Sequence, residues 1–241
     1  MSVKNSIAPK QSTNGIVEYN ANGANIKLST SIVKNYLVSG DPTKVTDQEV
    51  AVFINLCKYQ GLNPWLREAY LVKYGSSPAT IVTGKDAFMK RAEMDPNYDG
   101  FEAGVIIYDE EHGVQYREGE FRLPNEKIVG GWAKAYRTDR SHPYVAEVSF
   151  DEYAGKKSDG TLNSQWSTKP GTMIRKVALV HALREAFPVS LGGLYVAEEQ
   201  GVVENTTPLE PHDVVETEVK EAPATNGPVV ANPNYGGDSL L

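Results

Sequence analysis

The sequence has a single cysteine, Cys57, and this scarcity excludes two classes of small protein. One thiol cannot form an intrachain disulfide framework, and it cannot supply a zinc site that needs two or more thiolates. The chain also lacks an apolar run near the ~18 residues that a membrane-spanning helix requires. Its first fifteen residues contain no apolar core of the secretory type. We therefore expect a soluble protein of a reducing compartment with no membrane partner.

Acids are scarce in one part of the chain and abundant in another, which the formal net charge of −7 conceals. Residues 197–241 contain nine acids and one base, whereas Lys127–Arg184 contains ten bases and five acids. This asymmetry indicates a basic working surface and an acidic tail. The tail also holds five prolines and almost no aromatic residues, so it cannot offset the entropy of ordering. We expect a flexible N-terminal arm (1–25), a folded domain (26–199) and a disordered acidic tail (200–241).

Periodicity and turn residues predict helices, then a meander of antiparallel strands, then a long helix. Thr46 and Glu49 form a capping box that begins a helix ending at Gly61. Thr168 is expected to cap a helix that starts with Pro170 and runs to Pro188. The predicted fold class is α+β, an antiparallel sheet meander with N-terminal helices and a long C-terminal helix packed on it. The remaining segments are helices at Ser29–Val38 and Lys85–Met94 and strands at Ala69–Tyr74, Ala79–Thr83, Val105–Tyr108, Val114–Arg117, Val129–Thr138 and Tyr144–Phe150.

One predicted strand has an aromatic and basic face. Its alternation puts Trp132, Lys134 and Tyr136 on one side, and Ala133, Ala135 and Arg137 on the other. Such a face can stack on bases while its charge pairs with phosphate, at ~1–3 kcal/mol per stacked base. Alternatively, the two aromatic side chains belong to the core and Lys134 reaches the edge. The pattern alone leaves both interpretations open.

The last helix favours a polyanion-binding face. Lys169, Thr172 and Lys176 share one stripe, with Arg175 beside it and Arg184 about two turns further on. No acid occurs from Lys169 to Arg184, whereas a merely solvated helix usually alternates its charges. Bases at a helix start act together with its unpaired amides, which favour phosphate.

Two patterns that suggest catalysis are weak. Gly84-Lys85 resembles the end of a phosphate-binding loop, but Ala79 and Asp86 stand where that loop needs Gly and a hydroxyl. The run Asp109-Glu110-Glu111-His112 fits a solvated hairpin turn better than a metal cluster, because neighbouring strand residues point to opposite faces. We therefore expect no catalytic residue, no metal, no cofactor and no enzymatic activity.

Four motifs together carry a family resemblance over Ser31–Glu199. Gly61-Leu62-Asn63-Pro64, Trp132–Arg137, Lys169–Ala178 and Ala182–Pro188 are similar to segments of the RecT/Bet family of phage single-strand annealing recombinases. The resemblance implies an α+β domain that anneals complementary DNA strands without ATP and assembles into rings or helical filaments. It also implies action in the bacterial host cytoplasm beside a phage exonuclease, with an acidic tail that meets other proteins.

The resemblance and the charge pattern together predict a DNA groove. We expect the last helix and the Trp132 strand to converge on it and to bind single-stranded DNA and the annealed duplex. Strand-end and helix-start bases could border the same channel. The expected groove residues are Trp132, Lys134, Tyr136, Arg137, Lys169, Thr172, Arg175, Lys176 and Arg184, with Lys73, Lys85 and Arg91 as secondary candidates.

Several alternatives follow from the same residues. A passive single-strand-binding protector would use the same surface, and a metal-dependent nuclease would use Asp109, Glu111 and His112. The amphipathic helices within Ser29–Gln60 are candidates for packing between copies of a homo-oligomer. The acidic tail either recruits a host single-strand-binding protein or restrains unproductive DNA binding by mimicking its charge.

Overall fold

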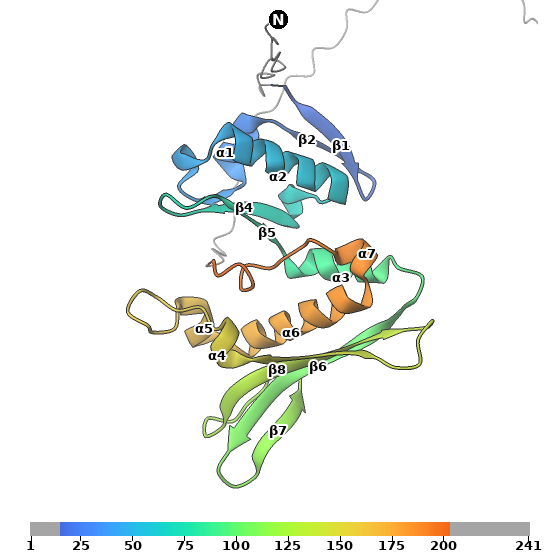
Figure 1. The fold of residues 1–241 in the computed structure, drawn as a ribbon, viewed down its shortest axis with the longest axis vertical. Helices are drawn as coiled ribbons and strands as arrows, with labels where there is room; N and C mark the ends of the chain where they lie inside the picture. Colours follow the sequence, from blue (N-terminus) through green and yellow to red (C-terminus); the bar gives the residue numbers. More distant parts are fainter. Residues whose placement is uncertain (1–14, 203–241) are drawn as a thin grey trace, which may run out of the picture. The chain divides into compact units, whose positions relative to one another are not determined.

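The computed structural model describes residues 15–202, and every structural statement below refers to that part. The chain divides into two compact units, residues 1–207 and 208–241, and the described residues all belong to the first. Antiparallel sheets combine with several helices, which confirms the predicted α+β class (Figure 1). In chain order the elements are β1 (Val17–Ala21), β2 (Ala24–Leu28), α1 (Thr30–Tyr36), β3 (Val38–Gly40), η1 (Pro42–Lys44), α2 (Asp47–Gln60), η2 (Pro64–Leu66), β4 (Ala69–Lys73), β5 (Thr80–Thr83), α3 (Lys85–Glu93), β6 (Tyr98–Asp109), β7 (Gly113–Glu118), β8 (Lys127–Arg137), β9 (Tyr144–Ser149), α4 (Phe150–Tyr153), α5 (Ser164–Thr168), α6 (Pro170–Ala186) and α7 (Pro188–Leu191), where η marks a 3₁₀ helix.

The β1–β2 hairpin lies within the segment that we expected to be a flexible arm. Its turn is Asn22-Gly23, and both residues have the positive φ that a two-residue hairpin turn needs. Tyr19 is buried, and its hydroxyl donates to the carbonyl oxygen of Leu62 at 2.8 Å. The arm expectation is therefore wrong for residues 17–25, because one side of the hairpin packs on the core. Residues 1–14 and 203–241 lie outside the described part.

Helix α2 begins and ends where its capping signals predict. The Thr46 hydroxyl accepts from the amide of Glu49 at 3.2 Å, and the Glu49 carboxylate accepts from the amide of Thr46 at 2.7 Å. Gly61 adopts the left-handed conformation and closes the helix, which confirms that prediction. The helix buries one face, formed by Val50, Phe53, Ile54 and Cys57.

A small sheet of order β3-β4-β5 lies against this helix. Strands β4 and β5 pair antiparallel as predicted, but β3 pairs with β4 in parallel. The parallel strand departs from the predicted antiparallel meander. Because β3 has only three residues, it is too short to show a period in the sequence.

Glu49 connects α2 to this sheet through its second carboxylate oxygen. That oxygen accepts from Lys73 Nζ at 2.8 Å and from the amide of Ala79 at 2.6 Å. The Lys73 side chain is only 6% exposed, so its charge depends on this carboxylate. Donation by Lys73 is the largest contribution that lowers the pKa of Glu49 to about 2. The pair therefore holds the two elements together.

The larger sheet has the antiparallel order β7-β6-β8-β9, and α6 lies along one face of it (Figure 1). Small residues of β8 let the helix approach closely. A Cβ at Gly131 would lie 2.6 Å from the carbonyl oxygen of Ile174 in the helix. Ala133 and Ala135 lie on the same face as Gly131 and are fully buried. The described helices include none with the length and apolar character needed to cross a membrane.

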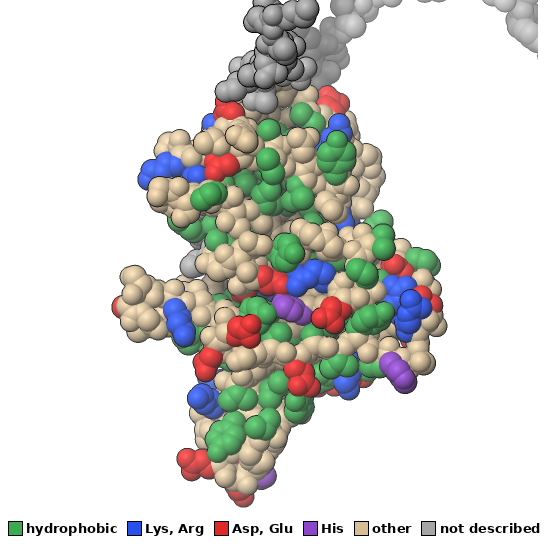
Figure 2. Space-filling model, viewed as in Figure 1, with side chains coloured by type: hydrophobic (Ala, Val, Ile, Leu, Met, Phe, Trp, Pro, Cys, Tyr) green, Lys and Arg blue, Asp and Glu red, His purple; other side chains and the backbone are tan. Residues whose placement is uncertain are grey.

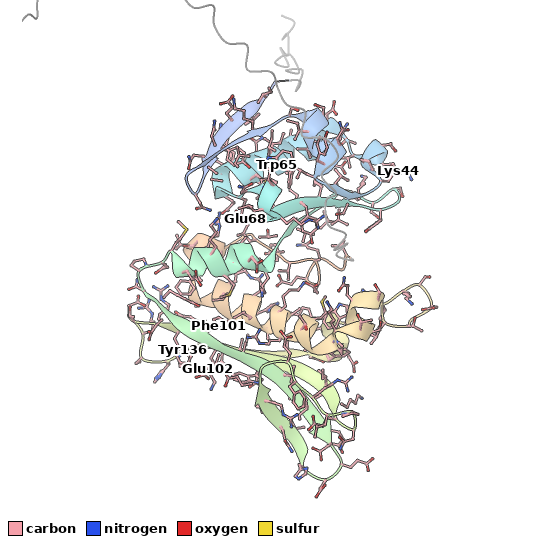
Figure 3. All side chains as sticks on the ribbon, turned by 180° about the vertical axis from the view of Figure 1, so that it is seen from behind. Lys44, Trp65, Glu68, Phe101, Glu102 and Tyr136 are labelled. Carbon is pink, nitrogen blue, oxygen red and sulfur yellow. The ribbon has the colours of Figure 1, made fainter. Side chains whose placement is uncertain are left out.

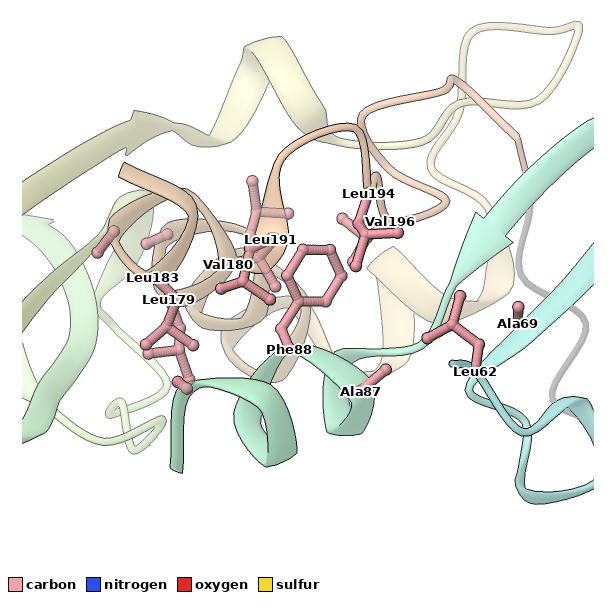
Figure 4. Packing of buried hydrophobic residues seen from close by; sticks show 14 of the residues in the cluster. Leu62, Ala69, Ala87, Phe88, Leu179, Val180, Leu183, Leu191, Leu194 and Val196 are labelled. Carbon is pink, nitrogen blue, oxygen red and sulfur yellow. The ribbon is translucent and has the colours of Figure 1, made fainter. Parts of the chain in front are cut away.

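Helices α3 and α7 cover the side of α6 that faces away from the sheet. Figure 4 shows Phe88 of α3 pointing towards Val180 of α6 and Leu191 of α7. Phe88 and Val180 are fully buried. As a result, α6 is enclosed between a sheet and two helices, and most of its residues belong to the core.

The segment that follows α7, residues 192–202, is called the C-terminal strap below. Ala197 of the strap packs on Tyr70 and Val82 of the small sheet. The amide of Thr83 donates to the carbonyl oxygen of Tyr195 at 2.9 Å. The strap therefore attaches to β4 and β5 as well as to α6.

Glu49→Gln should destabilise the protein, because it leaves the buried Lys73 ammonium without a carboxylate. We expect the free energy of unfolding in urea at pH 7 to fall by about 3 kcal/mol. The pKa of Glu49 is lower in the folded state than in the unfolded state, so its contribution is present above pH ~4.5 and disappears towards pH 2. Asp47→Asn is the control, since Asp47 is 66% exposed in its pair with Lys34 and should change stability by less than ~1 kcal/mol. If Glu49→Gln and Asp47→Asn lowered the free energy of unfolding equally, the stabilising role of the Glu49–Lys73 pair would be contradicted.

Candidate nucleic-acid interface

A pocket of about 350 Å³ lies where the first turns of α3 and α6 approach η2 and the loop after β7. This volume is within the ~300–1,000 Å³ that small-ligand pockets occupy. Four cationic side chains and two carboxylates line it, so its lining is positive. We call it the basic pocket, and its lining residues are Leu66, Arg67, Gly84, Lys85, Asp86, Glu120, Thr172, Arg175 and Lys176.

Helix α6 reaches the basic pocket with an N-terminus that no side chain caps. Its N-cap residue is Lys169, which has no side-chain cap hydrogen bond. The prediction that Thr168 caps this helix is wrong, because Thr168 ends α5 and its hydroxyl donates to the carbonyl oxygen of Ser164. The first-turn amides of α6 therefore lack a side-chain acceptor, and they favour an anion at this end of the helix.

Helix α3 presents a second N-terminus of the same kind. Its N-cap is Gly84, which has no side chain to accept from the first-turn amides. A Cβ at Gly84 would lie 2.6 Å from the carbonyl oxygen of Arg67, so only glycine permits this close approach. Lys85 follows as the first helical residue, and its side chain is 40% exposed. Two helix starts therefore contribute positive potential to one pocket.

Arg67 lies beside η2 in a backbone conformation that is uncommon for a residue with a side chain. Its φ is 56°, in the left-handed region, where non-glycine residues cost roughly 1–3 kcal/mol. The buried carboxylate of Glu68 holds this segment by accepting from the amide of Asn63 at 2.8 Å and from Lys90 Nζ at 2.8 Å. The surrounding hydrogen bonds thus fix Arg67 at the pocket.

Arg175 and Lys176 extend from α6 into the pocket in different ways. Arg175 Nε donates to the carbonyl oxygen of Ala103 in β6 at 3.1 Å, which fixes the guanidinium group. Lys176 Nζ lies 2.7 Å from a carboxylate oxygen of Glu198 in the strap. Both side chains are mostly buried, with 23% and 14% exposure.

Of the expected groove residues, the basic pocket brings together four: Lys85, Thr172, Arg175 and Lys176. Lys169 is exposed at the junction of α5 and α6 and is not among the lining residues. The last helix and a helix-start base therefore do share one site.

The aromatic and basic face of β8 lies elsewhere, and its expected convergence with α6 is wrong. Trp132, Lys134 and Tyr136 share a sheet face as predicted, but α6 packs on the other face, where Gly131 meets the helix. Trp132 is 9% exposed, and its indole Nε1 donates to the carbonyl oxygen of Arg117 at 3.3 Å. Because the helix covers the small residues, the large ones occupy the side away from it.

Acids surround Lys134 on that uncovered face. Lys134 Nζ lies 3.4 Å from Glu102 and 5.4 Å from the Trp132 ring centroid. Figure 3 shows Tyr136 beside Glu102 on the sheet. Glu147 on β9 accepts from the Tyr116 hydroxyl at 3.1 Å. This face is therefore aromatic and acidic, which does not favour a polyanion.

Four other expected groove residues have internal partners. Arg137 Nη1 donates to the carbonyl oxygen of Ala186 at the end of α6, and its guanidinium also binds Asp139. Arg91 donates to Gln60 and to the carbonyl oxygen of Ser190, and burial lowers the pKa of Arg91. The other two are Lys73, bound to Glu49, and Arg184, bound to Glu199.

Glu198 and Glu199 belong to the strap and not to an acidic tail that lies apart from the basic helix. Both carboxylates are nearly buried, with 3% and 7% exposure. Burial opposes the charge of Glu199, but His181 and Arg184 outweigh it and lower its pKa to about 2. The strap acids therefore neutralise the outer cations of α6, which changes the predicted basic stripe into a set of ion pairs.

The turn between β6 and β7 is held by hydrogen bonds to the carboxylate of Asp109. Asp109 Oδ1 accepts from the amides of Glu111 and His112 at 2.9 and 2.7 Å, and lies 3.0 Å from His112 Nδ1. Within residues 15–202, no three His, Cys, Asp or Glu side chains are grouped so that they could hold a metal ion. This arrangement fits the solvated turn better than the nuclease alternative.

The expected site does not include Arg67 and Glu120, which both line the basic pocket. The Gly61-Leu62-Asn63-Pro64 motif ends three residues before Arg67 and is a signal for that segment. Glu120 gave no local signal, because its role depends on contact with a helix 52 residues later in the sequence. On the face shown in Figure 2, acidic and basic side chains lie next to one another and form no continuous basic patch.

Comparison with known proteins places these residues in a family context. A family model described as RecT family matches residues 24–211, a range that contains every residue lining the basic pocket. Recombination protein bet of Escherichia phage lambda is 25% identical over 166 residues, which are 67% of this chain and 55% of that protein. An uncharacterised protein of Ureaplasma parvum serovar 3 is 30% identical over 148 residues, 61% of this chain and 58% of that protein. The chain therefore spans little more than half the length of either relative.

Arg184→Met tests whether Arg184 is a structural residue. Removing it leaves the buried Glu199 carboxylate without its guanidinium partner, so we expect the free energy of unfolding to fall by about 3 kcal/mol. Hydrogen exchange of the strap amides should accelerate, whereas affinity for single-stranded DNA should not change. Arg140→Met is the control, because Arg140 is 55% exposed in its ion pair. If Arg184→Met lost DNA affinity while it remained as stable as the wild type, Arg184 would instead be a DNA-binding residue.

Proposed function

We propose that this chain, which belongs to the RecT family, binds single-stranded DNA through the basic pocket and anneals complementary strands without ATP. One observation carries the proposal. Two uncapped helix N-termini and four cations meet in a single pocket, an arrangement that favours the binding of a phosphate.

The contacts available in the pocket suit a sugar-phosphate backbone. Arg67, Lys85 and Arg175 come from three different elements, and they present charge without a set of amide side chains that could read base edges. Phosphate contacts position a strand without selecting its sequence. Binding of this kind is sequence-independent and depends strongly on salt.

Annealing needs this kind of binding and no covalent chemistry. The protein has to neutralise two polyanions and leave their bases free to pair. A pocket that holds phosphates leaves the Watson–Crick edges available. The proposed role is therefore recombination by single-strand annealing, in which the chain binds DNA and the pairing of bases supplies the specificity.

One basic pocket can hold only a short length of strand, so we infer a homo-oligomer, a ring or a helical filament, in which neighbouring pockets continue the track. Helix α2 supports this inference, because Val52 and Tyr59 on its outer face are 55% and 84% exposed. The proposed partners are single-stranded DNA, the annealed duplex and, through the acidic tail, a phage exonuclease or a host single-strand-binding protein. The chain would act in the cytoplasm of a bacterial host.

A two-oligonucleotide assay tests the annealing activity directly. Two complementary labelled strands are mixed with the purified protein, without ATP, and the rate of duplex formation is measured. An annealing protein accelerates pairing above the protein-free rate. A slower rate would instead identify a passive protector of single strands.

Lys85→Ala should weaken DNA binding without unfolding the protein, because Lys85 is exposed at the pocket. We expect affinity for an unstructured oligonucleotide to fall about tenfold, the equivalent of one charge-assisted contact. The slope of log K against log salt should decrease by roughly 0.7. Fluorescence anisotropy at several salt concentrations measures both values.

Lys134→Ala is a matched control for this experiment. The Lys134 side chain has the same 40% exposure as that of Lys85, but it lies on the sheet face that α6 does not cover. This variant removes the same charge and should leave affinity close to that of the wild type. Equal losses in the two variants would show that binding does not depend on the pocket.

A further inference from the structure

Glu120 lines the basic pocket and contacts two of its polar side chains, Thr172 and Arg175. Its Oε2 accepts from Thr172 Oγ1 at 2.7 Å, and its Oε1 lies 3.6 Å from Arg175 Nη1. Its backbone also lies against the start of α6, since a Cβ at Gly171 would be 2.8 Å from the Glu120 carbonyl oxygen. An acid thus satisfies a hydroxyl and a guanidinium group beside an uncapped helix N-terminus. We propose that Glu120 is an internal competitor for the DNA backbone and sets the affinity of the pocket, an inference that rests on the proposed function.

The loop that carries Glu120 is itself firmly held. Arg117 Nη1 and Nη2 donate to the two carboxylate oxygens of Glu126 at 2.6 and 2.7 Å, which ties the end of β7 to the start of β8. Glu126 also accepts from the amide of Leu123 at 2.6 Å. The backbone of the loop can therefore stay in place while the Glu120 side chain rotates towards solvent.

Three carboxylates bind pocket cations, since Asp86 pairs with Lys85, Glu120 with Arg175 and Glu198 with Lys176. The exposure of the side chain distinguishes Glu120 from Glu198. The Glu120 side chain is 42% exposed, and its ion-pair partner Arg175 keeps its hydrogen bond to the Ala103 carbonyl when the carboxylate leaves. The Glu198 side chain is 3% exposed, and its partner Lys176 is 14% exposed. An exposed ion pair contributes little to stability, whereas separating a buried pair is strongly unfavourable. A phosphate can therefore displace Glu120, but Glu198 stays in place as the fixed partner of Lys176.

This difference predicts how the pocket discriminates between anions. A lone phosphate or other small anion has to replace the Glu120 carboxylate with little net gain. A strand that contacts several neighbouring pockets displaces each carboxylate within one binding event, because the later contacts are intramolecular. Glu120 thus favours long DNA over short anions, and it keeps the complex weak enough to release the annealed product.

Glu120→Gln and Glu120→Ala test the proposal in the full-length protein. Glutamine removes the charge but can still accept from Thr172, while alanine removes the contact entirely. We expect each variant to bind an oligothymidine of fixed length up to about fivefold more tightly, the equivalent of losing one exposed ion-pair competitor. The salt slope should stay close to that of the wild type, because the same phosphates are bound whether or not a carboxylate has to be displaced first.

Glu118→Gln is the matched control, since Glu118 is an exposed acid two residues away on β7. Its register partner Gly104 is also that of Trp132, so Glu118 shares the face that α6 does not cover. Glu118→Gln changes the net charge by the same amount as either Glu120 variant. A difference in DNA affinity between them therefore reflects the contact of Glu120 with Thr172 and Arg175. Thermal melting of every variant verifies that each one is folded.

The outcomes distinguish this inference from the function on which it rests. Tighter binding by both Glu120 variants than by Glu118→Gln supports the competitor. A second outcome is that Lys85→Ala weakens DNA binding while Glu120→Gln binds DNA no more tightly than Glu118→Gln. The inference that Glu120 competes with DNA is then wrong, and the pocket is still the DNA site. If neither Lys85→Ala nor Glu120→Gln changes affinity, DNA binds elsewhere, and both the function of the pocket and the competitor are wrong.

Discussion

The burial of α6 is the constraint on which the positions of its charges depend. The sheet encloses this helix on one side, and α3 and α7 enclose it on the other. A buried helix cannot keep isolated cations along its length, because an unpaired buried charge is strongly unfavourable. Beyond the first turn, the strap supplies carboxylates to two of the cations, with Glu198 opposite Lys176 and Glu199 opposite Arg184. Only the N-terminal end of α6 remains available for an external anion.

Local patterns in the sequence predicted much of the fold for identifiable physical reasons. The capping box of Thr46 and Glu49 needs only four consecutive residues, and Gly61 alone provides the left-handed end of α2. Alternation correctly put Trp132, Lys134 and Tyr136 on one face of β8. Alternation does not tell which face a helix covers. That choice followed from Gly131, Ala133 and Ala135, whose small size permits the approach of Ile174 and was a signal in the sequence for helix packing.

The candidate site was predictable only where charge and helix position coincided. Lys85, Thr172, Arg175 and Lys176 all lie near predicted helix starts, where the dipole and the open amides favour anions. Arg67 and Glu120 reach the same pocket through tertiary contacts that no local pattern records. Composition gives the charge along the chain and not its pairing in space, so the sequence alone does not distinguish Glu198 and Glu199 of the strap from the acids that follow them. A basic stretch without acids can therefore be neutralised from a distant segment, as Glu198 does for Lys176 across 22 residues.

The basic pocket combines two kinds of carboxylate contact, and the difference between them suits the proposed function, in which a strand is bound and a duplex is then released. A buried ion pair holds its two side chains in place, because separating them costs more free energy than one phosphate contact provides. The half-exposed Glu120 contact has the opposite property, since water and a phosphate oxygen can both replace the carboxylate at small cost. A site built only from buried pairs would be closed to DNA, and a site of unopposed cations would hold both strands too firmly to release them. In the proposed function, the buried Glu198 keeps Lys176 in position and the Ala103 carbonyl keeps Arg175 in position, while the exchangeable Glu120 carboxylate keeps the occupied and empty states close in free energy.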